Sequence, residues 1–230
     1  MDKHRVSAII AAGGRGLRLG AEMPKQFINV CGMPLLAWSA IPFCQCERIT
    51  EIVVTAPEDY IEMVWQIIHE FKLEKMASVV PGGATRQESV RNGINACKIP
   101  DVILTHDSVR PFVTIREIEA VIDGALEYGS CVTGVIPKDT IKAVDCKEIV
   151  TRTFDRSALR LIQTPQGFLA DILKRAHEEA VLDGAFGTDD AWLVERLGLD
   201  VYIAKGSYEN IKVTTKDDLM YCEWRLSRKI

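Results

Sequence analysis

The stretch VSAIIAAGGRGLRLGAEMPKQF, residues 6–27, decides how the chain begins its fold. Residues 6–12 form a short apolar run that glycines end at once, which is typical of a buried first strand. Glycines at positions 13, 14, 16 and 20 then stop a helix or strand from continuing, because glycine loses the most backbone entropy on ordering. Arg15, Arg18 and Lys25 add positive charge beside this turn. A glycine-rich turn with cations after a first strand predicts a phosphate-binding loop.

The spacing of the glycines excludes the two commonest phosphate loops. The dinucleotide fingerprint G-x-G-x-x-G would need its third glycine one residue earlier than Gly20. The nucleotide loop G-x-x-x-x-G-K-[ST] needs a lysine followed by serine or threonine, and the first lysine here is Lys25, followed by Gln26. With these two phosphate loops excluded, the remaining interpretation is a loop of the kind that serves nucleotidyl transfer. The plain alternative is a flexible surface loop with solvated charges.

Composition limits the class of protein. A chain of 230 residues with 47% hydrophobic and 26% charged residues is long enough for one domain with a full core. The net charge of −4 provides no basic field for nucleic acid, and no apolar run approaches the roughly 20 residues that cross a membrane. We expect the first apolar run to be a strand rather than a signal peptide. Seven scattered cysteines without a C-x-x-C pair argue against a disulfide framework or a zinc site, and favour the reducing cytoplasm.

Strand-like and helix-like patterns alternate from residue 6 to residue 136. This alternation predicts an α/β fold, a Rossmann-like three-layer sandwich with a mostly parallel, twisted sheet, and a single domain over residues 1–230. The predicted strands are 6–12, 51–56, 77–80, 101–105 and 130–136, and the predicted helices are 35–43, 57–72, 84–97 and 115–128.

The alternation breaks at about residues 137–159. Two segments of alternating β-branched and polar residues flank residues 145–147, which predicts a β-hairpin arm that projects from the body. Such an arm has too little core of its own and needs a partner surface. The chain then returns to the sheet at 163–168. We expect helices at 169–182 and 188–197, strands at 201–204 and 210–213, and a last helix that Thr215 caps, with Thr188 and Asp189 as candidate caps of the 188–197 helix.

Seven short motifs follow the glycine loop in a fixed order. Together with the loop they resemble the 2-C-methyl-D-erythritol 4-phosphate cytidylyltransferases, over essentially the whole chain. The motifs are GG at 82–83 with RQESV at 86–90, HDSVRP at 106–111, DTIK at 139–142, DRS at 155–157, QTPQ at 163–166, TDDA at 188–191 and NIKVT at 210–214.

The resemblance implies cytidylyl transfer from CTP to a polyol phosphate. An anionic phosphate oxygen attacks the α-phosphorus of CTP in line and expels pyrophosphate, so no strong general base is needed. The barrier comes from bringing two polyanions together, and the protein must supply cations, backbone donors and a metal. By resemblance, Arg18 and Lys25 stabilise the transition state, while Arg156 and Lys212 position the substrate phosphate.

The same resemblance assigns the binding residues. For the nucleotide we expect the loop residues Ala12, Gly13, Gly14 and Gly16, the cytosine-reading residues Gly82, Gly83 and Ser89, and also Asp107. For the polyol we expect Arg110, Thr140, Thr164 and Thr188, beside Arg156 and Lys212. Thr188 has the alternative of a helix cap, and Thr140 that of an ordinary strand residue.

Asp107 is the candidate metal ligand. It ends a predicted strand at the carboxyl edge of the sheet, where open α/β folds bind ligands, and Mg²⁺ takes few carboxylates beside phosphate oxygens. Its alternative is an N-cap of the next turn. Glu209 is either a second carboxylate of this site or a bystander. We expect His106 to be structural, because the reaction has no proton to move there.

Thr140 and Arg156 lie on or beside the predicted arm. In the family the arm clasps a second subunit and reaches its active site, so the resemblance implies a homodimer with composite sites. Two other functions stay open. A ribitol-5-phosphate cytidylyltransferase shares the loop, H-D-x-x-R-P and T-P-Q, although DTIK and DRS favour the first function. A non-catalytic nucleotide-binding regulator on the same fold would lack the catalytic cations, which this chain has.

Overall fold

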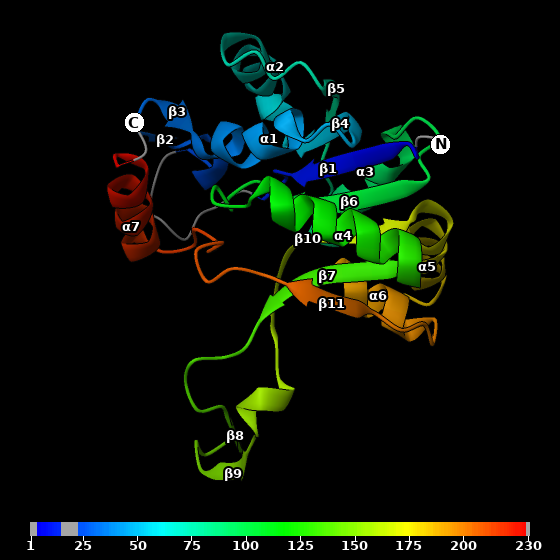
Figure 1. The fold of residues 1–230 in the computed structure, drawn as a ribbon, viewed down its shortest axis with the longest axis vertical. Coiled ribbons are helices and arrows are strands. Elements are labelled where there is room, and N and C mark those ends of the chain that lie inside the picture. Colours follow the sequence, from blue (N-terminus) through cyan, green and yellow to red (C-terminus); the bar gives the residue numbers. More distant parts are fainter. Residues whose placement is uncertain (1–3, 15–22, 229–230) are drawn as a thin grey trace.

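The computed structural model describes residues 4–14 and 23–228. Its centre is a seven-stranded sheet in which six strands run in one direction and β10 runs antiparallel to both of its neighbours. This confirms the predicted mostly parallel α/β fold (Figure 1). In spatial order the strands are β11 (Tyr202–Lys205), β7 (Ser130–Val135), β10 (Leu161–Leu169), β6 (Val102–Asp107), β1 (Val6–Ala11), β4 (Ile49–Ala56) and β5 (Met76–Pro81).

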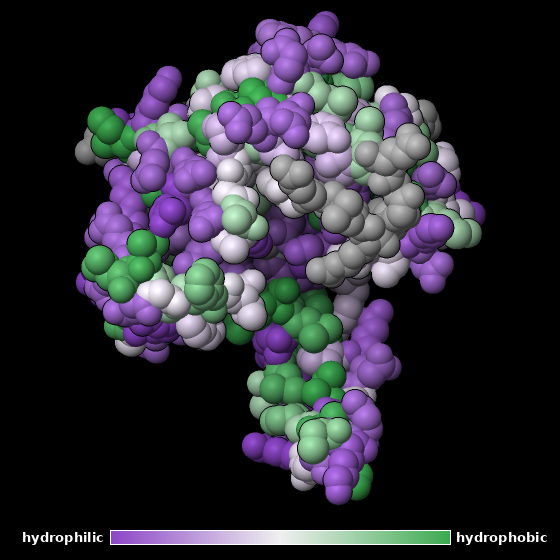
Figure 2. All heavy atoms as spheres, turned by 180° about the vertical axis from the view of Figure 1, so that it is seen from behind, coloured by the Kyte–Doolittle hydropathy of each residue, from purple (hydrophilic) through white to green (hydrophobic). Residues whose placement is uncertain are grey.

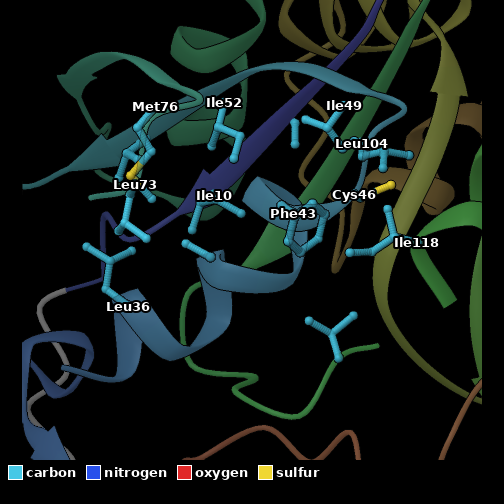
Figure 3. Close-up of a cluster of buried hydrophobic side chains, with 14 of the residues drawn as sticks. Ile10, Leu36, Phe43, Cys46, Ile49, Ile52, Leu73, Met76, Leu104 and Ile118 are labelled. Carbon is cyan, nitrogen blue, oxygen red and sulfur yellow. The ribbon is translucent and has the colours of Figure 1, made fainter. Parts of the chain in front are cut away.

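Helices cover both faces of the sheet, because side chains alternate along each buried strand. Ile10 of β1 packs with one set of helices and Ile9, its neighbour, with the other set. Figure 3 shows the first cluster, where Ile10 and Leu104 of the sheet lie near Leu36 and Phe43. On the Ile10 face lie α1 (Leu35–Gln45), α2 (Ile61–Glu70) and α4 (Ile115–Tyr128), and on the Ile9 face lie α3 (Arg86–Ala96), α5 (Ala170–Leu182) and α6 (Asp190–Arg196).

Four short elements and the last helix complete the body. The hairpin β2 (Asn29–Val30) and β3 (Met33–Pro34) packs with α7 (Lys216–Leu226) in a separate small core. Thr215 caps α7, as predicted. The remaining body elements are the 3₁₀ helices η2 (Lys25–Phe27) and η3 (Glu58–Tyr60). None of the helices in the described part of the chain is long and apolar enough to cross a membrane.

The predicted arm projects from the sheet between β7 and β10 (Figure 1). It consists of a separate two-stranded sheet, β8 (Lys142–Val144) and β9 (Val150–Thr153), and the 3₁₀ helix η4 (Arg156–Ala158). Apolar side chains gather on its surface in Figure 2. Val150, for example, is 53% exposed although β-branched residues of a stable sheet are normally covered. The arm therefore has the unburied surface that its composition predicts.

One prediction of local structure is wrong, and one short hairpin is missing from the predictions. Residues 210–213 do not form a strand, because they pass beyond the end of β6 and the Arg110 and Gln163 side chains take the Asn210 carbonyl. The short hairpin of β2 and β3 has no counterpart among the predicted elements. Of the two candidate caps of α6, the structure selects Asp189, whose side chain accepts a hydrogen bond from the Trp192 N–H.

Candidate active site

A cleft of about 880 Å³ lies at the carboxyl ends of the central strands. The register explains its place, because Ala11 at the end of β1 is level with Asp107 on β6 and Thr55 on β4. The segments that follow these parallel strands therefore meet at one edge of the sheet, where open α/β folds bind ligands. Its lining includes Gly13, Gly14, Lys25, Gly82, Gly83, Arg86, Ser89, Asp107 and Lys212.

The glycine loop is held from behind by Gln26, a buried residue to which sequence reasoning assigns no role. Its side-chain amide donates hydrogen bonds to the carbonyl oxygens of Ala12 (2.6 Å) and Gly14 (2.7 Å). Within residues 4–14 and 23–228, no acceptor takes the N–H of Gly13 or Gly14. The carbonyls of Ala12 and Gly14 are therefore bound, and the N–H groups of Gly13 and Gly14 have no acceptor among the described residues, which suits an anion. Arg18 and Gly16, both predicted site residues, lie outside the described residues, as does Arg15.

Gly13, Gly82 and Ser89 pack against one another at one wall of the cleft. A Cβ on Gly13 would lie 2.5 Å from the Ser89 Oγ, and one on Gly82 would lie 3.1 Å from the Gly13 Cα. A side chain at Gly13 would therefore displace the Ser89 hydroxyl, and one at Gly82 would crowd the Gly13 backbone. The Ser89 hydroxyl donates to the Thr85 carbonyl and accepts from the Gly83 N–H at 3.0 Å. The structure brings Gly13, Gly82, Gly83 and Ser89 together, and their contacts with a base stay predictions.

Lys25 and Lys212 line the same cleft from different segments. The Lys25 ammonium donates to the Val213 carbonyl at 3.0 Å, and Lys212 forms an ion pair with the Asp107 carboxylate at 2.9 Å. Lys25 begins η2, directly after Pro24. Two lysines that are 187 positions apart in the chain, from 25 to 212, thus line one cleft.

Asp107 is the centre of a cluster of positive charge. Arg86 contacts its Oδ1 at 3.2 Å, while Lys212 and Arg110 contact its Oδ2 at 2.9 and 3.5 Å. Burial acts to raise the pKa of Asp107, yet the charges of Arg86, Lys212 and Arg110 outweigh burial and hold that pKa well below its usual range. Asp107 is therefore ionised, and three cations around one carboxylate leave an excess of positive charge.

Arg86 and Asp190 are site residues that sequence reasoning missed. Arg86 spans two carboxylates, with its Nε on Asp107 and its Nη1 on Asp190 at 2.9 Å. Both residues lie inside quoted motifs, RQESV and TDDA, but neither motif shows that they meet. The available signal was the place of Arg86 in the first turn of a helix, where the dipole disfavours a cation and an acidic partner is needed.

Three predicted residues form a support beneath Asp107. The Thr164 hydroxyl accepts the Asp107 N–H at 3.1 Å and lies 2.9 Å from His106 Nδ1. His106 Nε2 donates to the Arg110 carbonyl, and burial lowers the pKa of His106 to about 3, so the ring is neutral. Arg110 donates in turn to the Asn210 carbonyl at 2.8 Å. His106 is structural, as predicted, and the Thr164 hydroxyl is engaged within the protein.

Three other predicted substrate residues lie outside the cleft lining. Arg156 and Thr140 are exposed on the arm, where the Arg156 guanidinium donates to the Lys138 carbonyl. Thr188 is exposed just before the cap of α6. The structure therefore does not bring these three residues to the cleft of their own chain, and their contacts with substrate stay predictions.

Comparison with known proteins gives one consistent family. A family model described as IspD: 2-C-methyl-D-erythritol 4-phosphate cytidylyltransferase matches residues 6–228. The enzymes of that name from Geobacillus thermodenitrificans and Clostridium acetobutylicum are both 42% identical, over 97% and 96% of this chain and 97% of each relative. The crystal structure of 4-diphosphocytidyl-2C-methyl-D-erythritol synthase from Anaerococcus prevotii superposes with a TM-score of 0.87, at 28% identity over 99% of this chain and 100% of that one.

The chain belongs to the 2-C-methyl-D-erythritol 4-phosphate cytidylyltransferase family. The resemblance drawn from the glycine loop and the seven motifs is confirmed. Nothing in these comparisons favours the ribitol-5-phosphate alternative.

Membership of this cytidylyltransferase family also implies a divalent metal. Among the described residues, no group of three histidine, cysteine or acidic side chains could hold a metal ion by itself. Glu209 forms an ion pair with Arg225 at 2.9 Å, which accounts for its carboxylate without a metal. Asp107 in the cleft fits a hard cation that takes most of its ligands from phosphate oxygens and water.

Proposed function

We propose that this protein transfers the cytidylyl group of CTP to 2-C-methyl-D-erythritol 4-phosphate, in non-mevalonate isoprenoid biosynthesis. The products are 4-diphosphocytidyl-2-C-methyl-D-erythritol and pyrophosphate. One observation carries the proposal from the structure. Gly13 and Gly14 line the same cleft as Lys25, Arg86 and Lys212, so backbone donors and cations converge where two polyanions would meet. The names of the relatives supply the identity of the two substrates.

The chemistry of the proposed reaction matches what lines the cleft. The attacking phosphate oxygen is already an anion, and no histidine lines the part of the cleft that the structure describes. Lys25, with Arg18, would neutralise the charge that builds on the α-phosphate, and Lys212 with Arg156 would hold the incoming phosphate. Removing one donor of this kind typically costs about 3–4 kcal/mol, or roughly 10²–10³ in rate. Electrostatic stabilisation therefore suffices without acid–base catalysis by a side chain.

Recognition of cytosine is proposed for the wall formed by Gly82, Gly83 and Ser89. These residues place backbone groups and one hydroxyl at the cleft without a bulky side chain in front of them. The polyol would meet Arg110 and, through the hydroxyl contacts that the family pattern implies, Thr140, Thr164 and Thr188. The glycine-loop residues from Ala12 to Gly14 would then receive the triphosphate.

We propose Mg²⁺ as the divalent metal, with Asp107 as its ligand from the protein. When bound, the ion would neutralise part of the triphosphate charge and orient the leaving pyrophosphate. Asp107 has a contact that can yield to such an ion, because the Lys212 side chain is 40% exposed while Asp107 is fixed from below by Thr164. Lys212 would then be released toward the substrate phosphate, which it is proposed to position.

We propose a homodimer in which the arm of one subunit completes the site of the other. Arg156 and Thr140 lie on the exposed arm, away from their own cleft, and the arm surface is apolar at Val144, Ile149 and Val150. An arm of two short strands is not stable alone in water and needs a surface to cover it. A second copy of the chain would cover the apolar residues and receive Arg156 at its cleft.

Seven unpaired cysteines further support a cytoplasmic location.

The activity is tested by pyrophosphate release from CTP with each of two acceptors. Purified protein with CTP and Mg²⁺ is expected to release pyrophosphate in the presence of 2-C-methyl-D-erythritol 4-phosphate and not with ribitol 5-phosphate. Release with ribitol 5-phosphate alone would contradict the proposed substrate. Release with neither acceptor would favour a non-catalytic nucleotide-binding protein.

A further inference from the structure

Arg86 occupies a position that its own helix disfavours. It is the first residue of α3, after a capping box formed by Thr85 and Glu88, so it lies at the positive end of the helix dipole. Through Asp107 it also shares a cluster with Lys212 and Arg110. Burial acts to lower the pKa of Arg86, but the carboxylates of Asp190 and Asp107 outweigh it and raise the pKa further. Two acidic partners therefore hold the Arg86 guanidinium in place as a cation.

Asp190 is the partner that lies outside the cleft. Its side chain is 1% exposed, and it is absent from the described lining. Its Oδ2 accepts hydrogen bonds from Arg86 Nη1 at 2.9 Å and from the Thr105 hydroxyl at 2.8 Å, and its Oδ1 lies 3.2 Å from His177 Nε2. Each oxygen is engaged, by residues of three different elements. A buried carboxylate with this many partners has one orientation, which it imposes on Arg86.

Arg86 transmits this orientation to Asp107. Its guanidinium is planar and rigid, so fixing Nη1 on Asp190 fixes the direction of Nε toward the Asp107 Oδ1. The Asp107 Oδ2 is then left to Lys212 and Arg110. Without Asp190, Arg86 could rotate toward the open cleft, where its own charge and the angle of Asp107 would both be misplaced.

We propose that Asp190 is a positioning residue for the cytidylyl transfer, acting through Arg86 on Asp107, an inference that rests on the proposed function. The neighbouring residue, Asp189, has a different structural role. Asp189 caps α6 and accepts a hydrogen bond from the Gln166 amide at 2.8 Å, with no contact to Arg86 among the described residues. The two adjacent aspartates of the TDDA motif thus provide a matched pair, one for position in the site and one for the helix end.

The experiment is a double-mutant cycle in kcat/KM for CTP. Asp190→Asn keeps the size of the side chain and removes its charge, and misplacement of catalytic groups is expected to lower kcat/KM on the order of 10²-fold. Because Asp190 acts through Arg86, Arg86→Gln and the double variant Arg86→Gln/Asp190→Asn are expected to share one kcat/KM. Asp189→Asn is the control. It is expected to leave kcat/KM near the wild-type value, and its effect is expected to be independent of Arg86→Gln.

Thermal unfolding is measured for every variant, so that each value of kcat/KM refers to folded protein. Asp190→Asn alone leaves Arg86 with one partner, whereas the double variant removes both charges and is expected to fold more stably. Should the single variant not fold, equal kcat/KM in Arg86→Gln and the double variant still supports the proposal. An Asp190→Asn enzyme with wild-type kcat/KM, or a double variant whose loss is the product of the single losses, would overturn it. A wild-type protein without pyrophosphate release would overturn the proposed function, and this inference with it.

Discussion

The cleft and the arm both carry arginines, and they hold them in different ways. Arg86, which lines the cleft, is fixed between two carboxylates, and Arg110, which lies outside the lining, is buried against Asp107 and the Asn210 carbonyl. On the arm, Arg156 is exposed and contacts only the Lys138 carbonyl among the described residues. Cations in the cleft are thus pre-organised before any ligand arrives, whereas the cation on the arm acquires its place when another surface meets the arm.

Among the predicted variants, Lys25→Ala is expected to cause the largest loss of activity, because it removes a cation of the cleft. Loss of this ammonium removes a charge contact to the α-phosphate, so pyrophosphate release should fall by roughly 10²–10³ while the thermal unfolding midpoint stays close to wild type. Lys174→Ala, an exposed lysine of α5 that does not line the cleft, is the matched control and should keep full activity. A Lys25→Ala enzyme that turns over like the wild type would refute the proposed role of Lys25.

Arg156→Ala tests the arm. If Arg156 positions the substrate phosphate, turnover should fall on the order of 10²-fold, because an unaligned phosphate reacts slowly. The sharper measurement mixes this variant with Lys25→Ala after dissociation and reassociation. A mixed dimer then has one cleft with an intact Lys25 that receives an intact Arg156, so activity should partly return. Each variant reassociated with itself is the control, and confirmed mixed dimers without recovered activity would argue against exchange of the arm.

Gln26→Ala tests the contribution of the glycine loop to CTP binding without removing a cation. Without the amide, the Ala12 and Gly14 carbonyls lose their donor, and an unsatisfied buried carbonyl costs about 1–3 kcal/mol. We expect the dissociation constant of CTP, measured by calorimetry, to rise about tenfold, which corresponds to about 1.4 kcal/mol. The dissociation constant of CMP, which lacks the β- and γ-phosphates, should change little.

Gln87→Ala is the matched control for Gln26→Ala. Gln87 also uses its amide to hold a loop, with hydrogen bonds to the Ala185 carbonyl and from the Gly187 N–H, but away from the cleft. Its loss should therefore leave CTP affinity unchanged. Equal effects of the two substitutions on CTP binding would show that Gln26 acts on general stability instead of on the glycine loop.

His106 is expected to affect the pH dependence of stability and not the rate at neutral pH. Its pKa is about 3 in the folded protein, against about 6.5 in the unfolded chain, so between these values the unfolded state binds the extra proton. Acidification below about 6.5 should therefore destabilise the fold by at most about 1.4 kcal/mol per pH unit from this group. Urea unfolding of His106→Gln should show a shallower pH dependence than wild type. His69→Gln, at an exposed position of α2, should not.

The elements that sequence reasoning placed well are those with a local signal. Helix α4 begins and ends at the predicted residues 115 and 128, because its apolar period is regular and Thr114 with Glu117 forms a capping box. The direction of β10 had no such signal, since a strand covered on both faces looks the same in either direction. Residues 210–213 have a strand-like pattern, but only the position of β6 shows that they lie beyond the sheet.

The residues of the candidate site likewise fall into those with a local sequence signal and those that depend on tertiary packing. The glycine loop and the H-D-x-x-R-P motif led to Gly13, Lys25 and Asp107, which line one cleft. Gly13 and Asp107 lie beside strand ends that the pattern shows, whereas the role of Lys25 came from the family resemblance. Arg86 and Asp190 are 104 positions apart, and their ion pair depends on how α3 and α6 pack on one face of the sheet. Gln26 was visible beside Lys25, but its role depends on the direction of two carbonyl groups, which composition does not encode.

The antiparallel placement of β10 has a consequence for how this protein can evolve. The chain leaves the body after Val135 and re-enters at Leu161, and these two residues face each other in one strand ladder. The whole arm is therefore a loop whose two ends are already joined by β7 and β10. Because loop-closure entropy grows only slowly with length, insertions and deletions in the arm leave every body strand in register. The length of the arm can therefore change without moving the body residues that line the cleft, whereas Thr140 and Arg156 must keep their reach to fill their proposed roles.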